Sequence, residues 1–224
     1  MGAGGVRGVF FDRDGTLVDS LGVVVDCYRR AIVEFEGPDR SADQIFASFS
    51  IGLARAMLSE LIGRPVGDMA VVRYESLLAD RCDEIRPYQG IRDAVARLGR
   101  SLPFTVFTAA DTSAANIILG ATGLSPFFAS VVGADLVAST QPAPDRLVEA
   151  ARRLGLDRAE VAYVGDGPSD FATARSLRCA GDRCGLGASA RSRERRRSRG
   201  RRSRALGHAA PRAGRRFARA VAVR

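Results

Sequence analysis

The sequence predicts an α/β fold, a doubly wound parallel sheet core with an all-helical cap domain inserted after the first strand. Three observations predict it. Short apolar runs alternate with helical patterns in the second half of the chain. Residues 21–86 read as helix only, and an insert of 66 residues is too long to be a structureless loop. Acidic and hydroxyl side chains follow the strand ends, where ligands bind in open parallel sheets.

The first strand and the helical insert occupy the N-terminal part. Val6 to Phe11 is a short apolar run that ends in an acidic residue, which is typical of a buried strand. From Leu21 to about Glu36 apolar residues recur every three or four positions, which predicts a helix. Gly37-Pro38-Asp39 ends that helix. Further helices are expected, with no strand between Ser20 and Pro87, over about 41–49, 53–62 and 68–86.

Strands and helices alternate after Gly90. The expected strands are 104–107, 130–132 and 161–164. The expected helices are 91–98, 113–121, about 147–154 and 171–177. The predicted domains are therefore a core formed by residues 1–20 and 87–189 and a cap formed by residues 21–86.

The net charge of the chain is concentrated at its C-terminal end. Residues 190–224 contain 14 of the 34 basic residues and one of the 25 acidic residues, a local balance of +13. The other 189 residues carry 20 basic and 24 acidic groups, so the body has a net charge of −4. We therefore expect a mildly acidic globular domain followed by a basic, disordered tail.

Two explanations of this tail stay open. Its Arg/Ser-rich composition is typical of disordered segments that bind nucleic acid non-specifically through phosphates. A shift of reading frame in GC-rich DNA would give a similar composition, and the coding DNA around residue 189 distinguishes the two. In neither case do we expect packed structure beyond Ser189.

Composition also limits the kinds of site and the compartment. The four cysteines have no C-x-x-C spacing, as is usual for reduced thiols. The single histidine, His208, lies in the tail, which excludes histidine-based chemistry from the body. With no apolar stretch of membrane-spanning length and no apolar leader at the N-terminus, a cytoplasmic location is expected.

Two acidic pairs follow predicted strands and carry the candidate chemistry. Asp12 and Asp14 follow the first strand, and Asp166 and Asp170 follow the strand at 161–164. Asp12 is the candidate nucleophile, because a carboxylate can attack phosphorus. Asp14 is placed to protonate the leaving oxygen and then to activate water. The four carboxylates are candidate ligands for Mg²⁺, with Asp170 alternatively a helix-capping residue.

Two further residues are candidates for phosphate binding. Gly15 permits a close backbone turn whose amides can face phosphate oxygens. Thr108 follows the strand at 104–107 and offers a hydroxyl donor. Arg13 is expected to face solvent or the cap.

These motifs resemble those of the haloacid dehalogenase superfamily. The first motif is matched by Asp12-Arg13-Asp14-Gly15-Thr16-Leu17, the second by Thr108, and the fourth by Gly165-Asp166-Gly167-Pro168-Ser169-Asp170. The insert looks like the C1 helical cap of the phosphoglycolate phosphatase and β-phosphoglucomutase branch. The resemblance implies a Rossmann-like core and a Mg²⁺-dependent phosphatase that acts on a small phosphorylated metabolite through an aspartyl-phosphate. It also implies that Ala109 binds phosphate beside Thr108.

The third motif departs from the pattern of the family. The family has a lysine before a proline, and here Gln141 precedes Pro142 in a chain without lysine. A charge-assisted hydrogen bond is about twice as strong as a neutral one, so Gln141 is expected to lower the rate. Arg13 and Arg146 are the nearest cations in sequence that could substitute. The alternatives to an active phosphatase are a catalytically impaired relative and a protein that binds nucleic acid through residues 190–224.

Overall fold

Four parallel strands form the main sheet, in the order β5-β4-β1-β6. The computed structural model describes residues 6–136, 143–166 and 170. Along the chain the sheet grows from β1 to β4 and β5 on one side, and β6 is then added on the other side of β1. The order of strands therefore reverses between β1 and β6, which is where open α/β sheets bind ligands. The strands are β1 (Gly8–Phe11), β4 (Phe104–Phe107), β5 (Ser130–Val132) and β6 (Val161–Val164).

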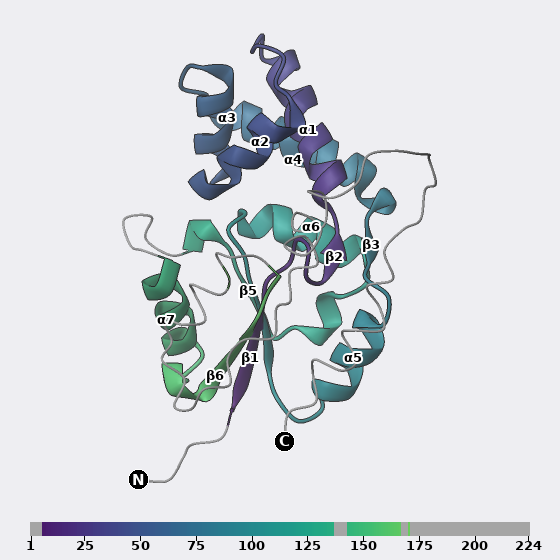
Figure 1. Ribbon diagram of the computed structural model, residues 1–224, viewed down its shortest axis with the longest axis vertical. Coiled ribbons are helices and arrows are strands. Elements are labelled where there is room, and N and C mark those ends of the chain that lie inside the picture. Colours follow the sequence, from purple (N-terminus) through teal and green to yellow (C-terminus); the bar gives the residue numbers. More distant parts are fainter. Residues whose placement is uncertain (1–5, 137–142, 167–169, 171–224) are drawn as a thin grey trace, which may run out of the picture.

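Helices cover both faces of this sheet, because alternate strand residues point to opposite sides. Phe11, Phe104 and Val106 belong to the larger core cluster, together with apolar residues of α5 and α6. Phe10 and Phe107 belong to a second cluster with residues of α7, on the opposite face. Figure 1 shows α7 on one side of the sheet and α5 on the other. The helices are α5 (Ile91–Leu98), α6 (Thr112–Ala121) and α7 (Ala143–Arg153).

The predicted fold class is confirmed by this arrangement. The strands at 104–107, 130–132 and 161–164 have the predicted bounds, and the first strand begins at Gly8 instead of Val6. These strands could be predicted because the runs are rich in β-branched and aromatic residues and lie between turn residues. The packing of the rings adds to the core, with Phe11 and Phe104 in edge contact at a centroid distance of 5.0 Å.

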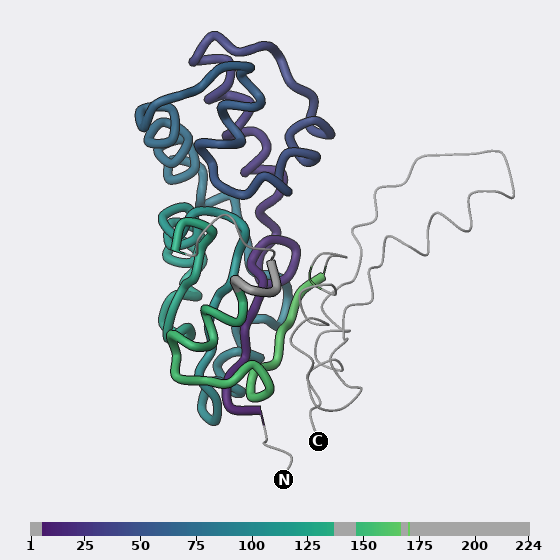
Figure 2. Tube along the Cα trace, turned by 90° about the vertical axis from the view of Figure 1, so that its left-hand side faces the viewer, coloured from purple at the N-terminus to yellow at the C-terminus, as the bar shows by residue number. Residues whose placement is uncertain are grey.

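Four helices make up the insert between β1 and β4, and they pack beyond the carboxyl ends of the strands (Figures 1 and 2). Their apolar faces meet around Tyr28, Ile32, Leu58 and Leu78, all of which are buried. Ser41 and Gln44 form a reciprocal capping box at the start of α2. The helices are α1 (Leu21–Glu34), α2 (Ala42–Ser48), α3 (Ala54–Ile62) and α4 (Asp68–Arg81), with short 3-10 turns at Phe49–Ile51 and Cys82–Glu84.

Two expectations for the insert were wrong. The helix expected over about 68–86 is shorter, since α4 ends at Arg81 and a 3-10 turn follows at Cys82–Glu84. No strand was expected between Ser20 and Pro87, but Arg86–Pro87 forms β3, which pairs with β2 (Val18–Asp19) in a two-residue antiparallel ribbon. The ribbon forms where the two connections between sheet and insert run past each other in opposite directions. Because the pairing joins residues far apart in the chain, the local sequence carries no signal for it.

The insert is bound to the core by contacts near the strand ends. The carboxylate of Asp111 accepts a hydrogen bond from the backbone N–H of Ala54 at 2.8 Å. The hydroxyl of Ser113, in α6, donates to Glu75 of α4. A Cβ at Gly52 would lie 3.6 Å from the carbonyl oxygen of Ala109, so the backbone at Gly52 approaches the strand end closely. The carboxyl edge of the sheet therefore faces the insert.

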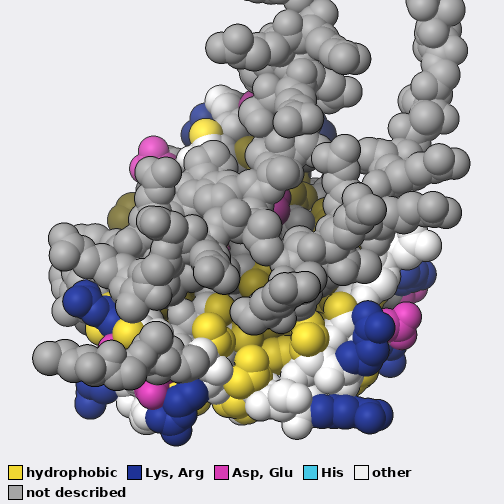
Figure 3. All heavy atoms as spheres, turned by 60° about the horizontal axis from the view of Figure 1, so that its bottom comes forward, with side chains coloured by type: hydrophobic (Ala, Val, Ile, Leu, Met, Phe, Trp, Pro, Cys, Tyr) yellow, Lys and Arg dark blue, Asp and Glu magenta, His cyan; other side chains and the backbone are white. Residues whose placement is uncertain are grey.

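The end of the sheet that lies opposite the insert has a surface different from that of the carboxyl edge. Figure 3 shows hydrophobic side chains at the centre of this view and arginine and acidic side chains around them. The helix expected at 171–177 and the tail at 190–224 lie outside the described residues. None of the helices in the described part of the chain has the length and hydropathy of a membrane span.

Candidate active site

The loop after β1 places Asp12 at the end of the strand. The backbone N–H of Asp12 donates to the carbonyl of Val164 at 2.8 Å, which continues the ladder between β1 and β6 by one residue. The chain then turns at Gly15, whose φ is +84°. In the same turn the N–H of Leu17 donates to the carbonyl of Arg13 at 2.9 Å. The tight turn directs the side chains after Asp12 back toward the sheet edge, as glycine permits.

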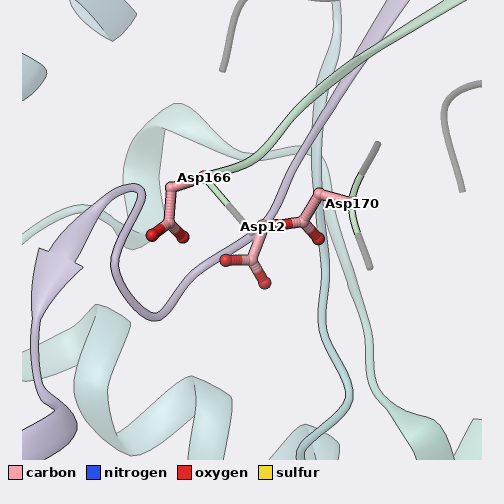
Figure 4. Close-up of side chains that lie close together, drawn as sticks. All are labelled: Asp12, Asp166 and Asp170. Atoms are coloured by element: carbon pink, nitrogen blue, oxygen red, sulfur yellow. The ribbon is translucent and has the colours of Figure 1, made fainter. Parts of the chain in front are cut away.

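Three carboxylates meet at the point where the strand order reverses. Asp12, Asp166 and Asp170 each offer an oxygen atom, and these atoms lie within 4.8 Å of one another. Figure 4 shows the three side chains, which come from the segments after β1 and β6. The hydroxyl of Thr16 lies 3.2 Å from an oxygen of Asp12 and 3.3 Å from one of Asp166. The fold thus brings Asp12 together with two acids that follow it by more than 150 positions in the chain.

The electrostatics of this cluster fit a divalent cation. The pKa of Asp12 is raised well above its ordinary value, chiefly because the half-buried carboxyl group is desolvated and then because Asp170, Asp14 and Asp166 repel its charge. Burial raises the pKa of the Tyr163 hydroxyl as well, and the nearby Asp12 and Asp170 add to it. Oxygen donors with like charges at this spacing are the ligand set of Mg²⁺ or Ca²⁺. A bound cation would offset the repulsion between these carboxylates, which is stronger because the site is partly buried.

Asp14 lies apart from the cluster of three carboxylates. Its carboxylate is held by the guanidinium of Arg13, whose Nε donates at 3.0 Å and whose Nη2 donates at 2.5 Å. The hydroxyl of Ser20 also donates to Asp14. Asp14 therefore accepts three hydrogen bonds on the side of the loop that faces the insert. Its predicted roles as acid/base and metal ligand stay predictions.

Arg13 does not face solvent, contrary to one reading of the sequence. Only 1% of its surface is exposed, and it is among the largest fully buried side chains of the described residues. Tyr74 of α4, in the insert, lies close enough to raise its pKa. A buried guanidinium is tolerated because Asp14 pairs with two of its nitrogens. The sequence carried no signal for this, because burial here depends on the insert.

Thr108 lies at the end of β4, beside β1 in the sheet. It is buried, and its hydroxyl oxygen accepts a hydrogen bond from the N–H of Ala110 at 3.2 Å. Its own backbone N–H donates to the carbonyl of Val132 at 3.1 Å. Ala109, the next residue, is exposed. Thr108 and Ala109, two of the three residues predicted to bind phosphate, thus lie at the edge of the sheet on which Asp12 lies.

Gln141 and residues 167–169 lie outside the described residues. The sequence did not single out Tyr163, whose hydroxyl donates to Asp170 at 3.0 Å. The signal available was its position three residues before Asp166, on the strand that carries the acids. By binding Asp170, Tyr163 orients one of the three clustered carboxylates.

The chain is similar in sequence to proteins that are named as phosphatases. The chain is 31% identical over 180 residues to "Probable phosphatase IndB" of Dickeya dadantii. The matched region covers 77% of this chain and 78% of that protein. It is 29% identical to a phosphoglycolate phosphatase of Chromobacterium violaceum, over 81% of the chain and 86% of the relative.

Similarity of structure extends to CbbY from Rhodobacter sphaeroides, solved in complex with phosphate. The TM-score is 0.65 and the identity 17%, over 77% of this chain and 83% of CbbY, so this likeness concerns the fold. Residues 6–178 match the family of haloacid dehalogenase-like hydrolases. With the acidic motifs at the strand ends and a match over most of its length, the chain belongs to the haloacid dehalogenase-like hydrolases.

Proposed function

We propose that this protein is a Mg²⁺-dependent phosphatase that hydrolyses a small phosphorylated metabolite through an aspartyl-phosphate. The observation that carries the proposal is the cluster of Asp12, Asp166 and Asp170 at the point where the strand order reverses. The names of the relatives from Dickeya dadantii and Chromobacterium violaceum support a phosphate ester as substrate.

The residues divide the reaction into two steps. An oxygen of Asp12 attacks phosphorus, the bond from phosphorus to the ester oxygen breaks, and Asp14 gives a proton to the leaving oxygen. Water then attacks the phosphorus of the aspartyl-phosphate while Asp14 takes a proton from it. The bond to Asp12 breaks, phosphate leaves, and both carboxyl groups return to their starting states. Thr108 and Ala109, at the end of β4, would bind phosphate oxygens during both steps.

Mg²⁺ fits the donor set of this site. Asp12, Asp166 and Asp170 would hold the ion, and Thr16 and Tyr163 orient those carboxylates. The ion would offset the negative charge of the carboxylates and the phosphate. Its affinity therefore depends on the acids of both strands, β1 and β6.

The direct test is an assay of the purified chain with p-nitrophenyl phosphate. We expect hydrolysis with Mg²⁺ present and none after treatment with EDTA. Trapping of a phosphorylated protein that is sensitive to hydroxylamine would establish the aspartyl-phosphate. Hydrolysis that is unchanged by EDTA would contradict the role of the carboxylate cluster.

Binding of Mg²⁺ should also stabilise the fold. At about 100 times the dissociation constant, a ligand adds about 2.7 kcal/mol to the stability of the folded state. For a domain of this size we expect Tm to rise by about 5 °C or more, measured by differential scanning fluorimetry. The variant Asp166→Asn should lose this shift. The exposed Asp80 provides a matched control, and Asp80→Asn should keep it; equal shifts in the two variants would contradict the metal site.

The catalytically impaired alternative rests on Gln141, and one variant tests it. Gln141→Lys should raise kcat on p-nitrophenyl phosphate by about tenfold or more, because a cation beside phosphate stabilises the transition state. The matched control is Gln44→Lys, which adds the same charge at the start of α2 and should leave kcat unchanged. An unchanged kcat in Gln141→Lys would show that this position does not limit the rate.

A further inference from the structure

The guanidinium of Arg13 has one nitrogen that the described structure does not use. Nε and Nη2 donate to Asp14, at 3.0 Å and 2.5 Å. Nη1 is buried and has no hydrogen-bond partner within the described part of the chain. Among the buried side-chain nitrogen and oxygen atoms of the described residues, it is the one that lacks a hydrogen-bond partner. Such a group is unusual, because buried donors in folded proteins are nearly always paired.

Arg13 lies between the nucleophile and the insert. Burial lowers its pKa, but Asp14, Tyr74 and Asp12 raise it by more, so the group keeps its charge. Tyr74 and Tyr28 stack on each other with ring centroids 4.1 Å apart, and both are buried. Their helices, α4 and α1, belong to the insert. The guanidinium therefore lies near acids of the core and near an aromatic side chain of the insert.

The direction of Nη1 is fixed by the pairing with Asp14. A guanidinium is planar and rigid, and its five donors point in set directions. Asp14 occupies the edge formed by Nε and Nη2, so Nη1 points away from that edge. Ser20 helps to hold the same carboxylate in place. The structure thus holds a charged donor, fixed in position, beside the group that would protonate the leaving oxygen.

We propose that Nη1 of Arg13 binds an oxygen atom of the alcohol part of the substrate, so that the site selects phosphate esters with a carboxylate or hydroxyl close to the ester bond. The inference rests on the proposed phosphatase function, since it places the leaving alcohol beside Asp14. Both candidate groups offer an acceptor oxygen to the same donor. A carboxylate is expected to bind more strongly, because the hydrogen bond joins two charged groups.

Three esters of similar size separate these possibilities. We would compare kcat/KM for 2-phosphoglycolate, 2-hydroxyethyl phosphate and ethyl phosphate, which carry a carboxylate, a hydroxymethyl and a methyl group on the carbon that bears the ester oxygen. The unmodified protein should prefer at least one of the first two to ethyl phosphate by about tenfold or more. In Arg13→Gln this ratio should fall to near one. A preference that survives in Arg13→Gln, or no preference in the unmodified protein, would overturn the inference.

The ratio of kcat/KM between the esters distinguishes a role of Arg13 in substrate binding from a role in positioning Asp14. Ser20→Ala loosens Asp14 without changing the guanidinium, so it should lower the rates for all three esters and keep their ratio. Arg30→Gln removes an exposed arginine of α1 that pairs with Asp26, and should change neither rate nor ratio. If Arg13→Gln does not fold, Arg13→Lys keeps the charge but lacks the planar fork, and should also lose the preference.

Calorimetry distinguishes failure of this inference from failure of the proposed function. Binding of 2-phosphoglycolate, 2-hydroxyethyl phosphate and ethyl phosphate would be measured with Mg²⁺ in Asp12→Asn, with and without Arg13→Gln. Selective binding that depends on Arg13, without turnover by the unmodified protein, would overturn the phosphatase and support the Arg13 site. Equal binding of the three esters would overturn the Arg13 site, whatever the rate of hydrolysis.

Discussion

Replacement of Asp12 by asparagine should reduce phosphatase activity by about three powers of ten or more while the fold stays intact. The amide cannot attack phosphorus, and loss of a nucleophile typically costs several powers of ten in kcat. The measurement is single-turnover and steady-state hydrolysis of p-nitrophenyl phosphate with Mg²⁺. Asp19→Asn is the control, since Asp19 is exposed and its side chain should not contribute to the reaction.

The same variant should be at least as stable as the unmodified protein when no metal is present. The pKa of Asp12 is raised in the folded state, above an unfolded value of about 3.9. Ionised Asp12 therefore costs stability at every pH above the unfolded value, and the cost grows until the pH passes the folded value. Asparagine removes this cost at pH 7. A clear fall in Tm without Mg²⁺, or near-normal turnover with it, would contradict the role given to Asp12.

Replacement of Gly15 by alanine should weaken Mg²⁺ binding by about ten- to a hundredfold, as changes beside metal ligands commonly do. A Cβ at this position would lie 2.7 Å from Oδ1 and 2.9 Å from Oδ2 of Asp166, so the carboxylate must move. Gly15 also has a φ of +84°, which costs alanine about 1–2 kcal/mol. Calorimetric titration with Mg²⁺ and thermal unfolding measure the two effects separately.

Gly22 offers a matched control for this variant. It lies in α1, has no heavy atom within 4 Å of a built Cβ, and has an ordinary helical backbone. Gly22→Ala should leave Mg²⁺ affinity unchanged and add up to about 1 kcal/mol of stability, the difference in helix propensity. Equal Mg²⁺ affinity in Gly15→Ala and Gly22→Ala would show that Asp166 does not bind the metal in the position described.

Much of the fold was predictable because its signals are local. The runs Phe104–Phe107 and Val161–Val164 are apolar, rich in β-branched and aromatic residues, and bounded by polar residues, so their bounds were predicted correctly. The helices of the insert follow from the spacing of their apolar residues and from breakers such as Gly37-Pro38. The ribbon between β2 and β3 was not predictable, because two-residue strands pair only where the fold brings distant segments together.

The candidate site was also predictable only in part. Asp12, Asp166 and Asp170 were candidates because each follows an apolar strand, and parallel strands end at a common edge. The structure brings the three together and adds Thr16 and Tyr163 as their hydrogen-bond partners. The sequence offered no means of seeing that Asp14 turns toward Arg13, since side-chain direction in a loop depends on what packs against it.

The sequence by itself determined the alternation of strands and helices, the insert of helices, the family and the acids that could bind a metal. Only the tertiary structure decided that the charge of Arg13 is buried, that it is paired with Asp14, and that its Nη1 has no hydrogen-bond partner within the described part of the chain. The physical reason is that periodicity records which face of an element is apolar. The burial of a single charged residue in a loop depends instead on the helices of the insert, which reach it only when the chain is folded.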